Sequence, residues 1–422
     1  MKLALLGADD QTLDLVREIG AYTPHEIVWG SELGTLEGAI RSLVPRMKAG
    51  EHWELLLGGT IADAVIVARH PDQEVRVEQL RKLLQAGVPT LVMHPICRSM
   101  LLAYELEMIR ADTKTVILPY LPDRLHPVSQ TFQGLFQTVA RAAWEPEQIL
   151  FDRYLIDRSR MAVTSQFARD VDLLQAICRP FDKMSAQGGS NEESAYANLS
   201  VQMTGEAGIP VRWNVMPAAD VPCAKMTIIH TSGKITIDIV SDAAAWSVSP
   251  DNRTEPIPPL PAGVAMLAQF EQALRGEKAQ AASWNDACRA IEMAETIERC
   301  LKRGRTVALH DEDFSEENTF KGTMTSLGCG LLVGGVVFAF FAALLQSFFK
   351  MIGFQAGAEF LNKWPYLLLA FMVIFLLLQG LLAVARPKED GGHSEEPEAN
   401  DDEAGKSEAQ NPKSETNSNF EI

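Results

Sequence analysis

Short apolar segments alternate with amphipathic helical segments over the first 120 residues, and this alternation restricts the fold more than any other feature of the chain. The apolar segments have the length of buried strands, and the helical ones have apolar residues at helical spacing. Alternation on this scale predicts a doubly wound parallel sheet with right-handed crossovers. Ligands of such sheets bind at the carboxyl ends of the strands, near the first strand–helix turn. The expected strands are Lys2–Leu6, Glu26–Trp29, Asp63–Ala68, Thr90–Met93 and Val116–Leu118, and the expected helices are Thr12–Ile19, Val75–Gln85 and Met100–Ala111.

The pattern changes after about residue 150, where period-2 alternation typical of antiparallel strands replaces the strand–helix order. We therefore expect an α/β architecture: a Rossmann-like, nucleotide-binding domain over 1–125, then an α+β domain with an open antiparallel sheet over 126–310. The open face of such a sheet could cover a substrate or form a homo-oligomer. The expected strands are Ala197–Thr204, Val211–Val215, Lys225–His230 and Ile235–Val240, and the expected helices are Arg169–Arg179, Val264–Arg275 and Ser283–Arg303.

Two later runs, Met324–Phe349 and Trp364–Ala385, carry no charged residue. Each is long enough to cross a hydrocarbon core as a helix of about 20 residues, and the alternative is a pair of buried helices. The short connection predicts a hairpin with both flanks on one side of the membrane. Lysine and arginine near those flanks, and a start that is too short and too acidic for a signal peptide, place the flanks in the cytoplasm. We expect a two-span membrane protein whose folded domains and C-terminal tail are cytoplasmic.

Acidic residues gather behind the second run. Residues 387–422 carry 3 Lys against 11 Asp and Glu, a net of −8 out of −17 for the whole chain. The tail 386–422 is too polar to bury a core, which predicts disorder, and 311–323 is expected to be an acidic linker. Without a basic face, a nucleic-acid partner is not expected. The six cysteines lack the spacing of a disulfide framework or a zinc site, so we expect free thiols and no bound metal.

Three stretches resemble the glucose–fructose oxidoreductase/inositol dehydrogenase (Gfo/Idh/MocA) family. They are Trp53-Glu54-Leu55-Leu56 with the following DAVIVA and LRKLLQAGVPTLVMHP runs, Asp123-Arg124-Leu125-His126-Pro127, and the passage from Gln269-Phe270 through SWNDACRAIEMAETIERCLKRGRTVAL. The resemblance covers roughly residues 1–310. It implies binding of NAD or NADP and hydride transfer at a sugar or polyol hydroxyl.

The first requirement implied by the resemblance is a glycine-rich turn that lets a dinucleotide diphosphate rest on a helix N-terminus. Here Gly7 is the one glycine of that motif, and Gly7 and Thr12 are the candidate contacts. Asp9 and Asp10 would place carboxylates beside the phosphates, which is unfavourable. The alternative is that an aspartate caps the helix. Glu32, after the second strand, is the candidate ligand for ribose hydroxyls, and the alternative is a solvated side chain.

The catalytic positions also differ from those of the family. Met93-His94-Pro95 stands where the resemblance implies Glu-Lys-Pro, so His94 could act as acid or base, or be a structural imidazole beside Pro95. The family's Asp-x-x-x-His pair falls on Ser165 and Arg169. Arginine cannot act as a base, but Arg169 could hold an anionic ligand, or it could pair with Asp172.

Three functions remain from these residues. The first is a membrane-anchored relative of the oxidoreductases that binds a sugar-like or nucleotide ligand, or a partner, without catalysis. The second is an active NAD(P)-dependent oxidoreductase in which His94 transfers protons. The third is a membrane scaffold in which the Rossmann-like unit is structural.

Overall fold

The computed structural model describes residues 1–137, 145–178, 180–188, 196–205, 208–218, 220–240, 246–250, 255–257, 261–304 and 306–309, with Leu344 and Met351. Residues 1–311 form one compact unit. In the described part of the chain, no helix has both the length and the apolar character needed to cross a membrane. The expected linker 311–323, spans 324–349 and 364–385, and tail 386–422 lie outside the described residues, apart from the two single residues.

The first sheet is parallel throughout and confirms the predicted Rossmann-like arrangement, with each predicted strand found to within two residues at either end. Its order is β3-β2-β1-β4-β5-β6, so successive strands are added on one side of β1 as far as β3 and on its other side from β4 onward. Fully buried strands such as AVIV in β4 explain why the sequence pattern was clear. The strands are β1 Lys2–Leu6, β2 Glu26–Ser31, β3 Lys48–Ala49, β4 Ala64–Val67, β5 Thr90–Met93 and β6 Ile117–Tyr120.

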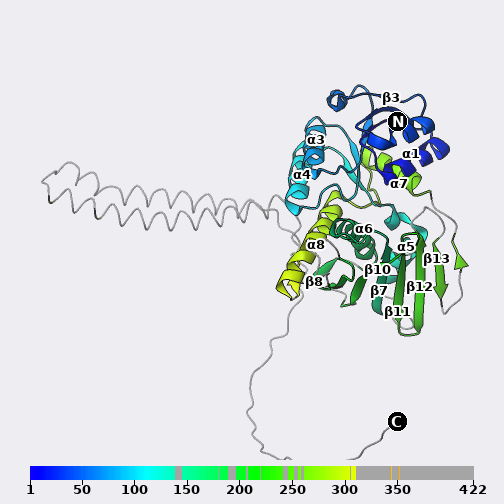
Figure 1. Ribbon diagram of the computed structural model, residues 1–422, viewed down its shortest axis with the longest axis vertical. Coiled ribbons are helices and arrows are strands. Elements are labelled where there is room, and N and C mark those ends of the chain that lie inside the picture. The colour runs from blue at the N-terminus through cyan, green and yellow to red at the C-terminus, as the bar shows by residue number, and fades with distance from the viewer. Residues whose placement is uncertain are drawn as a thin grey trace, which may run out of the picture. The chain divides into compact units, whose positions relative to one another are not determined.

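Helices cover both faces of this sheet and enclose two apolar cores. On one face α1 packs with α7, a helix from late in the chain, and Figure 1 shows the two side by side. On the other face, α3 and α4 pack with the first half of α8. The helices are α1 Asp10–Tyr22, α2 Glu37–Leu43, α3 Gln73–Gln85, α4 Met100–Thr113, α7 Ala262–Leu274 and α8 Trp284–Arg303, with 3₁₀ turns η1 Gly34–Leu36, η2 Trp53–Gly58 and η3 Pro122–Leu125.

The second sheet has nine strands within the described residues, in the order β14-β13-β12-β11-β7-β10-β9-β8-β15. It is mixed, which corrects the expectation of a purely antiparallel sheet, because β10 pairs with β7 in parallel. The strands are β7 Pro146–Leu155, β8 Phe181–Gln187, β9 Ser200–Gly205, β10 Val211–Pro217, β11 Cys223–His230, β12 Gly233–Val240, β13 Ser247–Pro250, β14 Glu255–Pro256 and β15 Val307–Ala308.

Helices α5 Pro127–Gln137 and α6 Arg160–Cys178 and the second half of α8 share one core with this sheet, in which Phe167 packs edge-on against Trp213. Helix α8 therefore contributes to one core of the first sheet and to the core of the second sheet. Its Trp284 donates its indole N–H to the Ala103 carbonyl oxygen of α4 at 3.2 Å, and its Met293 lies in the core of the second sheet. This helix ties the two sheets together, and the candidate site residues lie where they meet.

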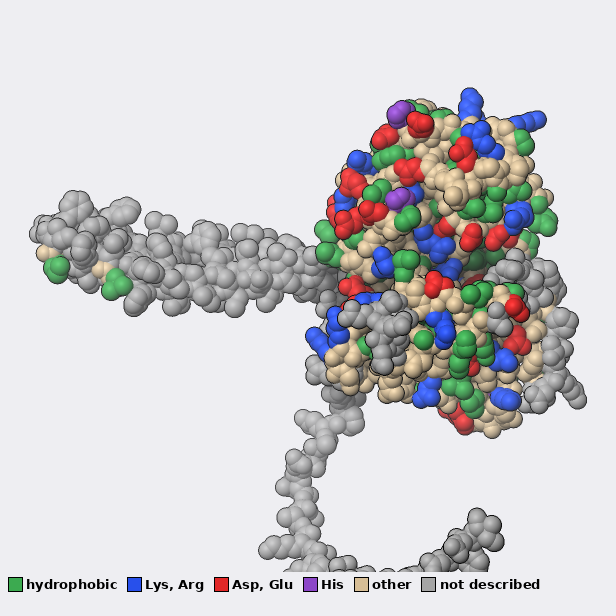
Figure 2. Space-filling model, viewed as in Figure 1, with side chains coloured by type: hydrophobic (Ala, Val, Ile, Leu, Met, Phe, Trp, Pro, Cys, Tyr) green, Lys and Arg blue, Asp and Glu red, His purple; other side chains and the backbone are tan. Residues whose placement is uncertain are grey.

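The surface seen in Figure 2 has acidic and basic side chains interspersed over both sheets' layers, without one continuous basic face in that view. The five cysteines in the described residues are free, and no metal-binding group of His, Cys, Asp and Glu occurs among these residues. Cys329 lies outside the described residues.

Candidate functional site

The turn between β1 and α1 is closed by its own aspartate. Asp9 is the N-cap of α1: its Oδ1 accepts hydrogen bonds from the Thr12 amide at 2.9 Å and from the Thr12 hydroxyl at 2.8 Å. The capping alternative for this turn is therefore confirmed, with Asp9 as the cap. Thr12 is fully buried, and its hydroxyl proton is already donated to Asp9. The helix N-terminus, where a diphosphate would rest in a dinucleotide fold, is already occupied by a carboxylate.

Arg69 compensates the Asp9 charge. It follows β4 closely, and its Nε donates to Asp9 Oδ2 at 2.7 Å. Burial alone would raise the pKa of Asp9. The Arg69 guanidinium and the Thr12 hydrogen bonds outweigh that effect and hold the pKa of Asp9 below its ordinary value. Asp9 is thus ionised and paired at neutral pH.

A second network fills the crevice beside Gly7. Arg76 of α3 is 1% exposed, and its Nη2 lies 2.5 Å from where a Cβ of Gly7 would stand. Its Nη1 donates to Gln79 Oε1 at 2.8 Å and lies 3.4 Å from Glu32 Oε2. Gln79 in turn donates to Glu32 Oε1 at 2.7 Å. The carboxylate of Glu32, the predicted ribose ligand, is therefore bound by side chains of the protein itself. Glu32 has a backbone φ of +55°, which residues other than glycine rarely adopt.

His94 lies at the end of β5, before a cis peptide bond to Pro95, and is 1% exposed. Its Nε2 has no hydrogen-bond partner among the described residues. Burial, with the nearby positive charges of Arg169 and Arg69, lowers the pKa of His94 to about 3, although a hydrogen bond to the Ala168 backbone acts in the opposite direction. The imidazole is neutral at physiological pH.

Arg169 of α6 approaches His94 across the junction between the two sheets. It donates from Nη2 to Gln166 Oε1, while its Nε has no partner among the described residues. Burial and the Arg69 charge lower the pKa of Arg169 to about 10. Arg169 does not form the suggested ion pair with Asp172. Arg124 from η3 pairs with Asp172 instead.

A second ion pair fixes α6 on its sheet. Arg153 of β7 is 5% exposed, and its Nε donates to Asp170 Oδ2 at 2.9 Å. The Trp213 indole N–H donates to the same oxygen at 2.9 Å. These contacts hold α6 in the position from which Arg169 reaches the junction.

The structure thus gathers the predicted residues into two neighbouring groups. Gly7, Thr12 and Glu32 lie at the carboxyl ends of the first sheet, and His94 lies against α6 near the charge of Arg169. Sequence reasoning did not find Arg69, which follows β4 at the same edge. Arg69 comes just after a buried strand, and this position could have identified it as a candidate site residue.

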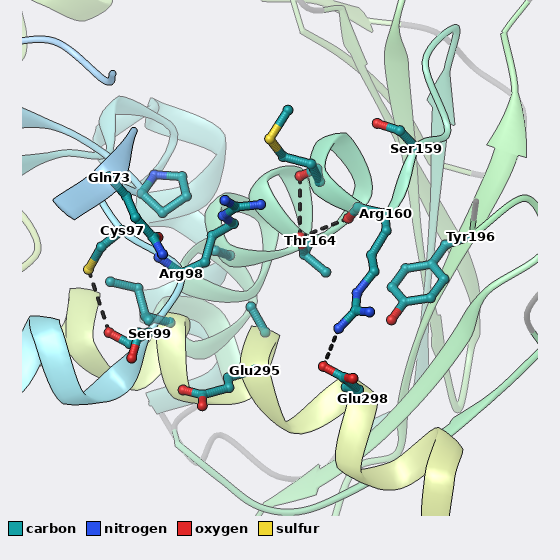
Figure 3. Close-up of a pocket in the computed structure, with 15 residues that line it drawn as sticks. Gln73, Cys97, Arg98, Ser99, Ser159, Arg160, Thr164, Tyr196, Glu295 and Glu298 are labelled. Atoms are coloured by element: carbon teal, nitrogen blue, oxygen red, sulfur yellow. Dashed lines mark hydrogen bonds and ion pairs between the residues drawn. The ribbon is translucent and has the colours of Figure 1, made fainter. Parts of the chain in front are cut away.

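A cavity of about 640 Å³ lies on another side of α6, between that helix, α8 and the loop after β5 (Figure 3). His94 and Arg169 do not line it. The lining residues are Gln73, Pro95, Cys97, Arg98, Ser99, Ser159, Arg160, Met161, Thr164, Ala168, Tyr196, Ile291, Ala294, Glu295 and Glu298.

Solved structures of Gfo/Idh/MocA-type dehydrogenases, inositol dehydrogenases among them, are similar to this chain. No family model matches the chain, and neither does any curated protein.

One similar structure is myo-inositol dehydrogenase from Lactobacillus casei in complex with NAD(H) and myo-inositol. Its TM-score is 0.60 at 13% identity, and the match covers 75% of this chain and 98% of that one. Another is a myo-inositol dehydrogenase from Corynebacterium glutamicum, with a TM-score of 0.58 at 16% identity over 74% and 99%. A third, an oxidoreductase from Agrobacterium radiobacter in complex with NAD+, L-tartaric acid and magnesium, has a TM-score of 0.58 at 11% identity over 73% and 98%. At these identities the likeness concerns the fold.

Proposed function

We propose that the chain is a ligand-binding protein built on the Gfo/Idh/MocA-type fold, and that it does not carry out hydride transfer. The observation that carries this proposal is the burial of His94 against α6, where it bonds the Ala168 backbone and lies near the positive charge of Arg169. Oxidation of a hydroxyl needs a nearby group that accepts its proton at neutral pH, and efficient bases have a pKa close to the working pH. His94, with a pKa of about 3, is too weak a base, and Arg169 stays protonated.

NAD or NADP is the candidate ligand of the first-sheet crevice, since similar structures contain NAD. A nicotinamide dinucleotide supplies hydride chemistry wherever it is bound. This chain would contribute the α1 N-terminus and Arg69 to its diphosphate. Asp9 opposes it, because Arg69 must exchange that carboxylate for a phosphate. The network of Arg76, Gln79 and Glu32 also occupies the space beside Gly7. The fit is therefore partial, and we expect weak binding.

The test measures thermal stability and turnover together on the full chain. Its unfolding temperature is recorded against increasing NAD(H) and NADP(H), and cofactor reduction is followed by absorbance with sugars and polyols present. A concentration-dependent stabilisation without turnover supports the proposal. Turnover would refute it, and no stabilisation at millimolar cofactor would remove the dinucleotide as a ligand.

The competing function is an active oxidoreductase. It is favoured by the unpartnered Nε2 of His94, which is neutral and could exchange a hydrogen bond with a substrate hydroxyl. If turnover is found, His94→Ala decides its role: an unchanged rate would exclude His94 from the chemistry.

We also propose that residues 324–349 and 364–385 anchor the protein as a hairpin, with the folded domains and the tail in the cytoplasm. The uncharged length of both runs supports this. Cysteines introduced at Gln355 and Ser407 test it: reagent outside intact cells should label the first and not the second. The reverse pattern would contradict the orientation.

Self-association through the second sheet is a further proposal. The face turned away from α6 carries hydrogen-bonded polar side chains, with Asn214 joining Ser200 and Asp152 at 2.8 Å each. A second copy could continue such contacts. Light scattering on the full chain should give a multiple of the monomer mass, and a monomer would refute the proposal.

A further inference from the structure

The cavity beside α6 has the size of a small-molecule site, within the range of about 300–1,000 Å³ that such sites occupy. Apolar and polar residues contribute about equally to its lining, and the charged ones are Arg98, Arg160, Glu295 and Glu298. The apolar members are Pro95, Met161, Ala168, Ile291 and Ala294.

Most charges in the cavity are compensated by neighbours. Arg160 pairs with Glu298, and Lys302 approaches the same carboxylate to 2.7 Å. Hydrogen bonding from Lys302 and the Arg160 charge hold the pKa of Glu298 below its ordinary value. Arg160 also lies over the Tyr196 ring, 5.8 Å from its centre. In Figure 3 this group forms one side of the cavity.

Glu295 is compensated by a helix end. Ser99 is the N-cap of α4 but makes no capping hydrogen bond with its side chain. The Glu295 carboxylate supplies the missing acceptor, taking a hydrogen bond from the Met100 amide at 2.8 Å. A carboxylate at a helix N-terminus is stabilised by the helix dipole, which offsets part of the Glu295 charge.

Arg98 is the charged lining residue that has no ionic partner among the described residues. Its backbone amide donates to Gln73 Oε1 at 2.8 Å, which fixes the loop. Its guanidinium makes no ion pair with any described residue, and it lies on the side of the cavity opposite the Arg160 group in Figure 3. An arginine on a fixed loop recognises a carboxylate or phosphate with two parallel hydrogen bonds.

We propose that this cavity binds a small molecule with one anionic group and an apolar body. The anionic group is held by Arg98, and the apolar body lies along Met161, Ile291 and Ala294. The Tyr196 hydroxyl lines the cavity and can contact a further polar group, whereas the Thr164 hydroxyl already donates to the Arg160 carbonyl oxygen at 2.8 Å and can only accept. Gly7, Thr12, Glu32 and Arg69 do not line this cavity, so this proposal stands independently of dinucleotide binding.

Benzoate is the probe, because it combines one carboxylate with an apolar ring, and benzamide is its uncharged match. Titration calorimetry on the full chain should show benzoate binding at least tenfold more tightly than benzamide. Arg98→Gln should weaken benzoate at least tenfold. Arg212→Gln, an exposed arginine on the second sheet, is the matched control and should leave it unchanged.

Met161→Trp provides a test by size. Met161 is 55% exposed at the cavity rim, so a larger side chain is accommodated without unfolding and narrows the space. Benzoate binding should then be lost while the unfolding temperature is kept. Equal affinity for benzoate and benzamide, or unchanged binding in Arg98→Gln, would overturn the proposal, as would an absence of benzoate binding to the wild type.

Discussion

Replacing Asp9 with asparagine tests the electrostatics of the first turn. Asparagine caps helices about as well as aspartate, so the bonds from Thr12 are retained. What is lost is the charge-assisted bond from Arg69 at 2.7 Å, between side chains that are 28% and 17% exposed. For such a partly exposed pair we expect the free energy of unfolding to fall by about 1 kcal/mol at pH 7.

The effect of pH on this variant has a definite sign. The pKa of Asp9 is lower in the folded protein than in the unfolded chain. Its ionisation therefore contributes stability that is present above the unfolded pKa of about 4 and is lost as the pH falls through the folded value. The difference between wild type and Asp9→Asn should be largest near neutrality and should shrink below about pH 4. Urea unfolding of the full chain at several pH values measures it.

The same substitution should improve dinucleotide binding. Two unit charges about 4 Å apart near a protein surface repel by up to about 4 kcal/mol, of which solvent leaves only part. Relief of this repulsion, with Arg69 released for a phosphate, should tighten NAD at least tenfold, or about 1.4 kcal/mol. Asp72→Asn, a change of the α3 cap that bonds the Glu74 amide at 3.0 Å, is the control. An unchanged NAD affinity in Asp9→Asn, or an equal gain in Asp72→Asn, would refute the reasoning.

Two further predictions concern stability, measured by urea unfolding. Gly7→Ala should lower the free energy of unfolding by about 2–3 kcal/mol, because a positive φ of +80° is combined with a contact to Arg76. Gly87→Ala has a similar φ but open space around it, and should lower that free energy by only about 1 kcal/mol. Equal losses would show that Arg76 does not fill the space beside Gly7. Asp170→Asn should cost about 3–5 kcal/mol, since it leaves the buried Arg153 charge uncompensated; a cost below about 1 kcal/mol would contradict the role of this pair in holding α6.

The first sheet could be predicted from the sequence because its strands are buried on both faces and form continuous apolar runs. Strand β7 was not foreseen, because Arg153 stands at an inward position and interrupts the apolar alternation. Only the fold supplies the Asp170 carboxylate that makes this arginine tolerable there.

The sequence predicted where the candidate site residues lie, but not which side chains they contact. Gly7, His94 and Arg169 could be named from motif spacing, yet the groups that decide their chemistry come from elsewhere in the chain. Arg69 lies 60 residues from Asp9, and Gln79 lies 47 residues from Glu32. Such pairings follow from the order β2-β1-β4 in the sheet, which no local pattern specifies.

The most direct test of the central claim is the rate of NAD+ reduction by the full chain with saturating sugars and polyols. The wild type should give no rate above the protein-free control at pH 7, because neither His94 nor Arg169 can accept a proton there. Reduction of NAD+ by the wild type above that control would contradict the account.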